Sequence, residues 1–262
     1  MPVTDQAEII KIVLIIEYEG TRYHGFQLQG KLPTIQKELE TSIFKLTGER
    51  IRVVTASRTD AGVHAEAQVA SFRTTTVHPA ETWRNALNYY LPQDIAVKEA
   101  YRVRDSFHVR RNAVSREYRY RILNGNARSP LRDRFCYLVT GRLDIDAMNE
   151  AAGLLLGERD FASFVNNKEA ALKGTVRRMH RAEMRREGDL VVFDIMANSF
   201  LMHQVRNTVG SLLRLGRGKI SREDFRDILE AKEPGRAWPT APARGLCLVK
   251  VNYNNPFKEE QW

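Results

Sequence analysis

The pattern of hydrophobic and polar positions predicts an α+β chain that passes twice through a similar series of elements. In the first half, alternation with period two and short apolar runs predict strands at residues 11–19, about 50–56, about 66–73 and about 94–104. Apolar positions at helical spacing predict helices from about Thr34 to Leu46, ended by Gly48, and at about 80–90. The order is β-α-β-β-α-β, the split βαβ arrangement.

The second half repeats this order with additional elements. Strands are predicted at 114–122, near 134–139, at about 173–187 and 189–197, and from Gly245 onward. Helices are predicted after Asp144, with Leu154 and Leu155 on the inner side, at about 200–215, and after Ser221 as its cap.

The expected fold class is therefore α+β, with two split βαβ (ferredoxin-like) halves, largely antiparallel sheets and a central cleft that could hold RNA. We predict an N-terminal half over residues 1–105 and a C-terminal half over 106–262. No Pro/Gly-rich linker separates them, so one continuous body is expected.

Charge distinguishes the two halves. The net charge is +9, and residues 1–105 hold 13 basic and 13 acidic residues, so the whole excess lies after residue 105. Arginine dominates over lysine, and its planar fork suits phosphate and stacks on bases. A basic surface of this kind fits nucleic-acid binding, although a solvated basic surface would look the same.

Several classes of protein are not indicated. No apolar run is long enough to cross a membrane, and the first eleven residues lack the basic start of a signal peptide, so a cytoplasmic protein is expected. Cys136 and Cys247 have neighbours typical of buried strand and no metal spacing. Motifs for nucleotide triphosphates, dinucleotides and zinc are missing, so we expect no cofactor and no metal.

Asp60 is the first candidate for chemistry. It lies in A-S-R-T-D-A-G-V-H-A, a loop between two predicted strands, with Arg58 two residues before it and Gly62 two residues after it. Asp followed by Ala-Gly is also ordinary turn chemistry. A carboxylate beside a guanidinium, however, stays ionised near neutral pH and can serve as a nucleophile or a base.

A segment rich in Arg and Tyr follows. Residues 102–121 contain seven Arg and two acids, and the strand after Val114 places Arg116, Tyr118 and Tyr120 on one face. Glu117, Arg119 and Arg121 share the other face, and Glu117 could simply pair with an arginine. Interleaved Arg and Tyr can stack a base and hold phosphates, and a solvated edge strand is the alternative.

A third segment, S-F-L-M-H-Q-V-R-N-T-V-G from Ser199, carries Arg206 beside an apolar helical stripe. Arg206 is either a surface residue with a buried stem or a partly buried arginine directed at a carboxylate. His203 has no second ligand at metal spacing, which argues against zinc. The segment A-P-A-R-G-L-C-L from Ala241 is either an edge of the sheet or part of a pocket floor.

Together these segments resemble a known family. S-R-T-D-A-G-V-H-A resembles the signature of the TruA family of tRNA pseudouridine synthases, and the segments from Phe107, Phe200 and Ala241 resemble its later motifs in the same order. The similarity extends from about Ile12 to Tyr253. One position departs from the pattern, because Ser57 stands where the family usually has Gly.

The resemblance implies an isomerase that converts uridine to pseudouridine in the tRNA anticodon stem-loop, at tRNA positions 38 to 40, as a homodimer without a cofactor. It places the catalytic aspartate on Asp60, the tyrosine that stacks on the target base on Tyr118, and the arginines around the carboxylate on Arg58 and Arg206. For holding the RNA backbone the candidates are Arg110, Arg111, Arg116 and Arg119.

Two other functions remain open at this stage. A non-catalytic RNA-binding protein could use the same basic stripe and tyrosines, but it gains nothing from a carboxylate near phosphates. A nucleoside glycosidase would need a second positioned carboxylate to activate water, for which Glu66 and Glu117 are the candidates.

Overall fold

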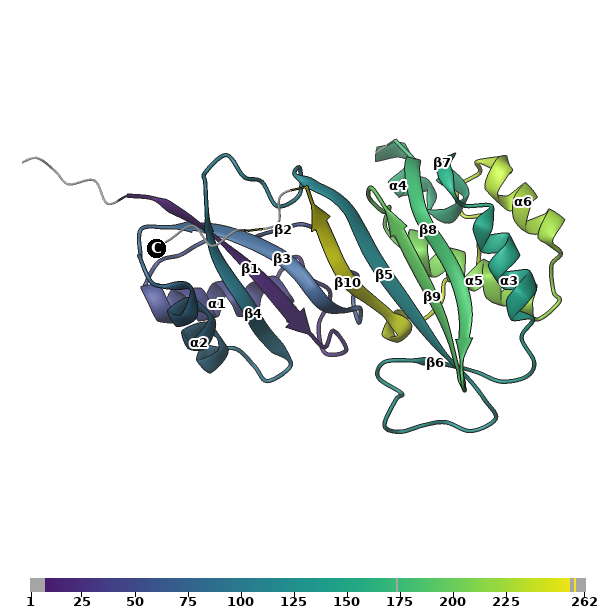
Figure 1. The fold of residues 1–262 in the computed structure, drawn as a ribbon, viewed down its shortest axis with the longest axis horizontal. Coiled ribbons are helices and arrows are strands. Elements are labelled where there is room, and N and C mark those ends of the chain that lie inside the picture. Colours follow the sequence, from purple (N-terminus) through teal and green to yellow (C-terminus); the bar gives the residue numbers. More distant parts are fainter. Residues whose placement is uncertain (1–7, 173, 255–256, 258–262) are drawn as a thin grey trace, which may run out of the picture. The chain divides into compact units, whose positions relative to one another are not determined.

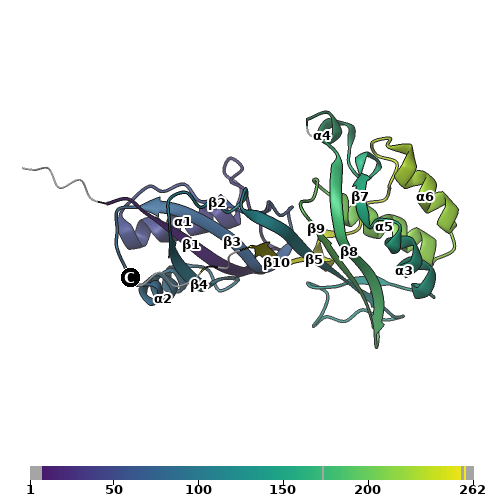
Figure 2. The same ribbon diagram turned by 45° about the horizontal axis from the view of Figure 1, so that its top comes forward.

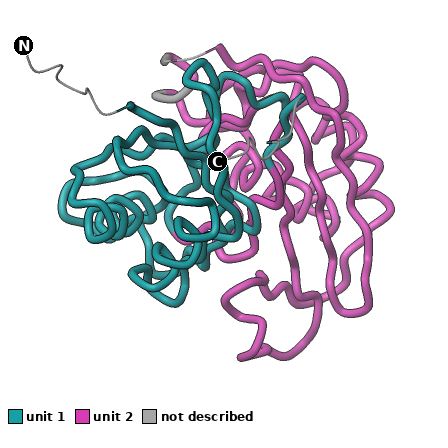
Figure 3. The backbone as a smooth tube through the Cα atoms, turned by 60° about the vertical axis from the view of Figure 1, so that its left-hand side comes forward, with its two compact units in different colours: residues 1–61, 65–114, 251–262 teal, residues 62–64, 115–250 magenta. Residues whose placement is uncertain are grey.

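The computed structural model describes residues 8–172, 174–254 and 257, and the chain forms two compact units (Figure 3). Unit 1 contains the chain up to residue 61, residues 65–114 and the chain from residue 251. Unit 2 contains residues 62–64 and 115–250. The chain thus passes between the units at four places, after residues 61, 64, 114 and 250. The predicted division into halves at residues 105 and 106 stays a prediction, and the predicted absence of a signal peptide concerns residues that lie mostly outside the described part.

Unit 1 is a small antiparallel sheet with two helices. The strand order is β4-β1-β3-β2, with β1 paired antiparallel to both β3 and β4. Helix α2 packs against β4 and α1 (Figure 1). The elements are β1 (Ile10–Tyr18), α1 (Ile35–Thr47), β2 (Val54–Thr55), β3 (His64–Thr74), α2 (Ala80–Tyr90) and β4 (Ile95–Val103).

Local signals set the ends of α1 as predicted. The Thr34 hydroxyl accepts a hydrogen bond from the Lys37 backbone N–H at 3.3 Å, which satisfies one of the donors left open at a helix start. Gly48 ends the helix with φ of 75°, a left-handed conformation that suits glycine. Ile35, Leu39 and Ile43 are fully buried, so the predicted apolar stripe forms the inner face.

Unit 2 repeats the order with additions. Its strands follow the order β10-β5-β9-β8-β7, and β6 runs parallel to β5. Helices α3, α5 and α6 contact one another on one side of β8 and β9 (Figures 1 and 2). The elements are β5 (Ala113–Asn124), β6 (Tyr137–Val139), α3 (Ile145–Gly153), β7 (Gly157–Asp160), α4 (Asn167–Leu172), β8 (Val176–Glu187), β9 (Leu190–Ala197), α5 (Gln204–Gly216), α6 (Arg222–Ala231) and β10 (Leu246–Tyr253).

The predicted fold class is confirmed. Unit 1 reads β1-α1-β2-β3-α2-β4 in sequence and 4-1-3-2 across its sheet. In unit 2 the strands β5, β8, β9 and β10 take the same four places, and α3 and α5 take those of the two helices. The pairs β1–β3, β1–β4, β2–β3, β5–β9, β7–β8 and β8–β9 are antiparallel, and β5–β6 is parallel. The predicted central cleft stays a prediction.

The strand predicted at 50–56 is mostly wrong. Only Val54 and Thr55 form the strand β2 beside β3, and the Ala56 N–H adds one bond to the Val69 carbonyl at 2.8 Å. The backbone of Val53 is instead bonded by side chains of α1, because its N–H donates to Glu40 at 3.0 Å and its carbonyl accepts from Gln36 at 3.2 Å. These bonds satisfy polar groups that a strand ladder would otherwise have to satisfy.

Two helix boundaries also differ from prediction. Helix α5 begins at Gln204 because His203 has φ of 61°, a left-handed conformation that an α-helix cannot contain. Helix α3 ends at Gly153, where hydrogen bonds change to the tighter i→i+3 type at Leu154 and Leu155. Leu155 is fully buried, whereas Leu154 is only half-buried.

The short elements β7 and α4 were not predicted, since neither has an amphipathic repeat long enough to detect. Cys136 and Cys247 are both free and buried, as their neighbours indicated. Within the described ranges, no helix combines the length and the apolar character needed to span a membrane.

Candidate active site

Asp60 lies in the loop between β2 and β3. Hydrogen bonds of the neighbouring Thr59 fix this loop to the rest of unit 1. The Thr59 hydroxyl shares a buried hydrogen bond of 2.8 Å with the Tyr18 hydroxyl. The Thr59 carbonyl accepts from the Phe26 backbone N–H at 3.2 Å. Both contacts belong to unit 1 and fix the residue next to Asp60. The Asp60 side chain itself is half-buried.

The same loop is held before Arg58 by a buried glutamine. Gln68, which is fully buried, donates to the Ser57 carbonyl at 2.7 Å and accepts from the Ser57 N–H at 3.4 Å. The non-glycine residues with positive φ in the described ranges are His203 and Lys232. Ser57 therefore has an ordinary φ, and its presence in place of the family's usual Gly strains nothing.

Gly25 lets a second loop approach the Asp60 loop closely. Its φ is +83°, and a Cβ atom at this position would lie 2.6 Å from the Thr59 carbonyl oxygen. Only glycine combines this conformation with so close an approach. The backbone before Asp60 is thus set by residues distant in sequence.

Two basic side chains lie at this part of unit 1, Arg58 in the loop itself and Arg110 beside it. Arg58, Arg110 and Arg111 are all exposed. One terminal nitrogen of Arg110 donates to the Thr55 carbonyl at 3.5 Å. Partial desolvation and, second, the positive charge of Arg58 lower the pKa of Arg110, so the two guanidinium groups repel each other near the loop. An anion would relieve this repulsion.

Tyr118 belongs to β5 in unit 2. It is 5% exposed, and its ring meets the Phe200 ring edge to face with centroids 5.2 Å apart. The predicted alternation along β5 is confirmed, because Arg116, Tyr118 and Tyr120 all lie on a buried face. The Tyr120 hydroxyl donates to the Pro242 carbonyl at 2.8 Å, and burial raises the pKa of Tyr120.

Arg116 and Arg119 have structural contacts of their own. Arg116 is 6% exposed and donates to the Asn198 carbonyl at 2.7 Å. Arg119 donates to Asp194 at 2.7 Å, and Arg185 bonds the same carboxylate. Burial alone would raise the pKa of Asp194, but the hydrogen bonds from the two arginines lower it below its usual value. Glu117 pairs with Arg181 at 3.3 Å, as its basic surroundings indicated.

Arg206 lies in the first turn of α5 and is half-buried. Its Nε donates to the Ala241 carbonyl at 2.8 Å. This contact joins the helix motif to the segment from Ala241, two stretches that the sequence showed as separate. Pro242 and Tyr120 also connect there, so the segment packs against β5 as well as α5.

The predicted site residues fall in both units. Arg58, Asp60, Arg110 and Arg111 belong to unit 1, whereas Arg116, Tyr118, Arg119 and Arg206 belong to unit 2. His64, in the signature motif, belongs to unit 2, where its ring lies 5.0 Å from that of Phe135 and its Nε2 is 3.2 Å from the Arg244 carbonyl. Sequence analysis missed Tyr18, Gln68 and Gly25 as supports of the Asp60 loop, because no local pattern distinguishes them.

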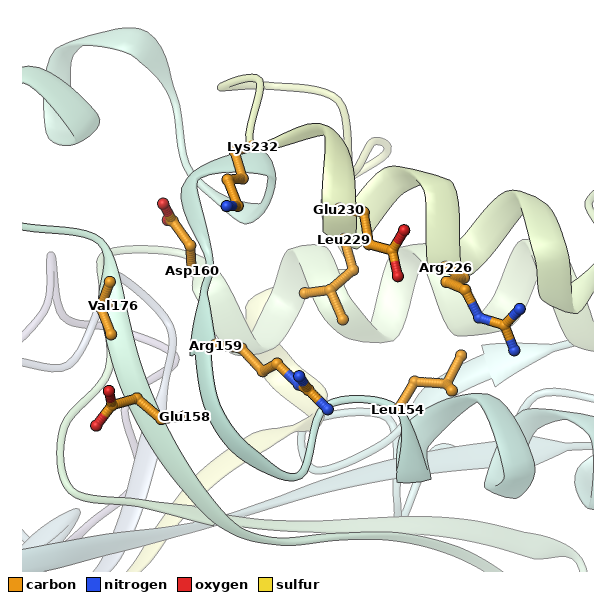
Figure 4. A pocket seen from close by; sticks show the side chains of 9 residues that line it. All are labelled: Leu154, Glu158, Arg159, Asp160, Val176, Arg226, Leu229, Glu230 and Lys232. Atoms are coloured by element: carbon orange, nitrogen blue, oxygen red, sulfur yellow. The ribbon is translucent and has the colours of Figure 1, made fainter.

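Unit 2 also has a pocket of about 590 Å³ between β7 and α6 (Figure 4). Apolar Leu154, Val176 and Leu229 line it together with three acids and three basic residues. None of the predicted site residues lines this pocket. Among the described residues, no group of three or more His, Cys, Asp or Glu could hold a metal ion.

Comparison with known proteins decides the family. A family model described as tRNA pseudouridine synthase matches residues 14–111 and 151–254, which includes Asp60 and Arg206. The chain belongs to the tRNA pseudouridine synthase family. The resemblance seen in the motifs is thereby confirmed, and with it the class of reaction, an isomerisation of uridine to pseudouridine in tRNA.

Individual members of this family match over nearly their whole length. The tRNA pseudouridine synthase A of Thermoanaerobacter sp. (strain X514) is 40% identical over 242 residues, covering 92% of this chain and 99% of that protein. That of Acetivibrio thermocellus is 42% identical with the same coverage. That of Shewanella amazonensis is 41% identical over 248 residues and covers 95% of each chain.

Among solved structures, a dye-decolorizing protein from V. cholerae matches with 12% identity and a TM-score of 0.18, over 81% of this chain and 88% of that one. A similarity this weak supports no conclusion about fold or function.

Proposed function

We propose that this chain isomerises uridine to pseudouridine in the tRNA anticodon stem-loop, at tRNA positions 38 to 40, with Asp60 as the catalytic residue. One observation carries the assignment of Asp60. Its loop is fixed by a buried Tyr18–Thr59 hydrogen bond and by Gln68, more support than a surface turn needs.

The reaction breaks the C1′–N1 bond of uridine, turns the uracil and joins C1′ to C5. The C5 proton leaves and N1 gains a proton, so substrate and product are isomers and no water enters. One carboxylate suffices for this, whereas a glycosidase needs a second group to activate water. Asp60 acts either as a nucleophile at C1′ or C6 or as a base at C2′.

The target uridine must leave its stack before reaction, which costs a few kcal/mol. We propose that Tyr118 offsets part of this cost by stacking on the uracil, worth about 1–3 kcal/mol. Tyr118 already packs edge to face with Phe200, so its ring is held before RNA arrives. A held ring loses little rotational freedom on binding.

For the phosphates we favour Arg110 and Arg111, which are both exposed, and Arg110 bonds to the Thr55 carbonyl just before the Asp60 loop. The lowered pKa of Arg110 fits a site where positive charges repel until an anion binds. Arg116 and Arg119 were predicted for the same task. Their bonds to Asn198 and Asp194 support a role in shaping β5, and direct RNA contact by them stays a prediction.

We propose that Arg206, with Arg58, keeps the Asp60 carboxylate ionised and oriented. Arg58 precedes Asp60 by two residues in the same loop, and Arg206 is fixed through its Nε by Ala241. We further propose a homodimer in the cytoplasm, where tRNA is found, acting without a cofactor.

The decisive experiment follows tritium at uracil C5 of tRNA. Wild type should release tritium and form pseudouridine, and Asp60→Asn should bind tRNA yet release none. Equal release from Asp60→Asn would refute the role of Asp60. Product analysis separates the other functions, because free uracil indicates a glycosidase and unchanged tRNA indicates a simple binder.

Mapping pseudouridine in the same reactions tests the substrate. Modification confined to positions 38 to 40 is expected. Modification elsewhere in tRNA would leave the chemistry intact but contradict the assignment to the anticodon stem-loop.

A further inference from the structure

Three successive contacts join helix α5 to residues 239–241 in unit 2. The first is reciprocal: Arg206 Nε donates to the Ala241 carbonyl at 2.8 Å, and the Ala241 N–H donates to the Arg206 carbonyl at 3.1 Å. The backbone groups of one residue thus hold both the side chain and the main chain of Arg206.

The second contact is made by Asn207, which is 8% exposed. Its amide nitrogen donates to the Phe164 carbonyl at 2.7 Å, and its amide oxygen accepts from the Thr240 hydroxyl at 2.6 Å. One buried side chain therefore ties α5 to the residue before Ala241 and to the turn at Phe164. A buried amide satisfied on both sides has little freedom to move.

The third contact is a close approach of backbone. A Cβ atom on Gly210 would lie 1.7 Å from the Pro239 carbonyl oxygen. The segment therefore rests directly on the helix, one turn after Arg206, with no side chain between them. Contacts at residues 239, 240 and 241 fix the distance of this segment from α5 and its register along the helix.

This arrangement limits how the Arg206 guanidinium can lie. Arginine has five N–H donors in a rigid plane, and the one on Nε is used by Ala241. The other four donors lie on the terminal nitrogens, which form the edge of the guanidinium that would face a carboxylate or a phosphate. The position of the Ala241 carbonyl therefore sets the direction in which the terminal nitrogens of Arg206 point.

We propose that Asn207 and Thr240 are positioning residues that hold Arg206 in its working orientation through Ala241. The inference rests on the proposed role of Arg206. Losing the Thr240–Asn207 bond removes one of the three contacts between α5 and residues 239–241. A displacement of about 1 Å in a group such as the Arg206 guanidinium can slow a reaction about 100-fold.

Thr240 offers the cleanest test because it is exposed, so its substitution leaves the core intact. Thr240→Val removes the hydroxyl at nearly constant shape, and Thr240→Ser retains it. Single-turnover rate, tRNA Kd and thermal midpoint are measured for each. Thr240→Val should slow the reaction about 10-fold or more with Kd changed less than twofold, and Thr240→Ser should restore the rate.

Asn207→Ala is the stronger variant and needs a matched control for lost stability. Gln36 in unit 1 is 4% exposed and likewise bridges backbone groups, accepting from Leu28 N–H and donating to the Val53 carbonyl. Asn207→Ala and Gln36→Ala should lower the thermal midpoint similarly. Only Asn207→Ala should slow single turnover when both are fully folded.

A double-mutant comparison decides whether Thr240 acts through Arg206. If it does, Arg206→Ala/Thr240→Val should be no slower than Arg206→Ala alone, since coupled residues are not additive. The inference would be overturned if the rate reductions of the two single variants multiplied in the double variant. It would also be overturned if Thr240→Val reacted at the wild-type rate while Arg206→Ala was impaired. An Arg206→Ala variant that reacts normally would refute the role of Arg206 and the positioning role together. Loss of tritium release in Asp60→Asn would still support the proposed function in that case.

Discussion

Tyr18 and Thr59, 41 residues apart in sequence, share a buried hydrogen bond of 2.8 Å that holds the residue next to Asp60. Tyr18 ends β1, and Thr59 lies in the loop before β3. Tyr18 also accepts from the Gln68 amide at 3.4 Å, and this amide donates to the Ser57 carbonyl in the same loop. The sheet of unit 1 thus supports the Asp60 loop through buried polar side chains.

Tyr18→Phe should therefore weaken both stability and catalysis. It removes one hydroxyl and leaves the Thr59 hydroxyl, in a residue only 7% exposed, without this bond. We expect a loss of about 1–3 kcal/mol in the free energy of unfolding. Urea unfolding measures the first effect, and single-turnover pseudouridine formation should fall as well. If Tyr18→Phe is less stable but reacts at the wild-type rate, this hydrogen bond contributes to folding and not to the chemistry.

Gly25→Ala tests the close approach to the same loop, with Gly30→Ala as its matched control. Both glycines have positive φ, +83° and +51°, so both substitutions carry backbone strain. Only at Gly25 would the new Cβ meet another backbone, at 2.6 Å from the Thr59 carbonyl, because Gly30 has nothing within 4 Å. Gly25→Ala should be the less stable and the less active variant.

Equal activities for Gly25→Ala and Gly30→Ala, measured with both proteins folded, would show that the Asp60 loop tolerates displacement. The contribution of the Gly25 contact would then be to folding only.

Asp194 should make the stability of unit 2 depend on acid pH. Its pKa is lowered in the fold, so the stabilisation is fully present above the ordinary Asp value of about 3.9 and is lost as pH falls through the lowered value. Asp194→Asn keeps the shape but removes the charge, and should cost about 1.5–3 kcal/mol at neutral pH. The difference in unfolding free energy between wild type and variant should shrink on acidification below about pH 4. If the unfolding free energies of wild type and Asp194→Asn changed in parallel with pH, the stabilising role of the Asp194 carboxylate would be contradicted.

Arg111 and Arg119 should differ in the salt dependence of tRNA binding. Arg111 is exposed, so Arg111→Ala should weaken binding and reduce the slope of log affinity against log salt by about 1. Arg119 is bonded to Asp194, so Arg119→Ala should lower stability and leave the slope unchanged. A reduced slope for Arg119→Ala would instead support its predicted contact with RNA.

Most elements could be predicted because their signals are local. Thr34 and Gly48 bound α1, and the Ser221 side chain and Asp224 form a reciprocal cap on α6. Period-two alternation correctly divided β5 into two faces. It could not tell which face is buried, because Arg and Tyr occur together on one of them, and the buried face turned out to include Arg116.

The misplaced elements have a common physical cause. Val53 reads as strand, but its backbone groups are taken by Gln36 and Glu40 from a helix earlier in the chain. His203 reads as helix, but it adopts a left-handed conformation that local propensity does not predict. In both cases the contacts that determine conformation come from beyond the local sequence window.

By itself the sequence determined the α+β class, the repeated order of elements and the family, and it pointed to Asp60 as the candidate, because each depends on residues close together along the chain. Only the tertiary structure decided that Tyr18, Gln68 and Gly25 hold the Asp60 loop and that Ala241 holds Arg206. These partners are remote in sequence, and a hydrogen bond between them depends on distances of a few tenths of an ångström that packing alone sets.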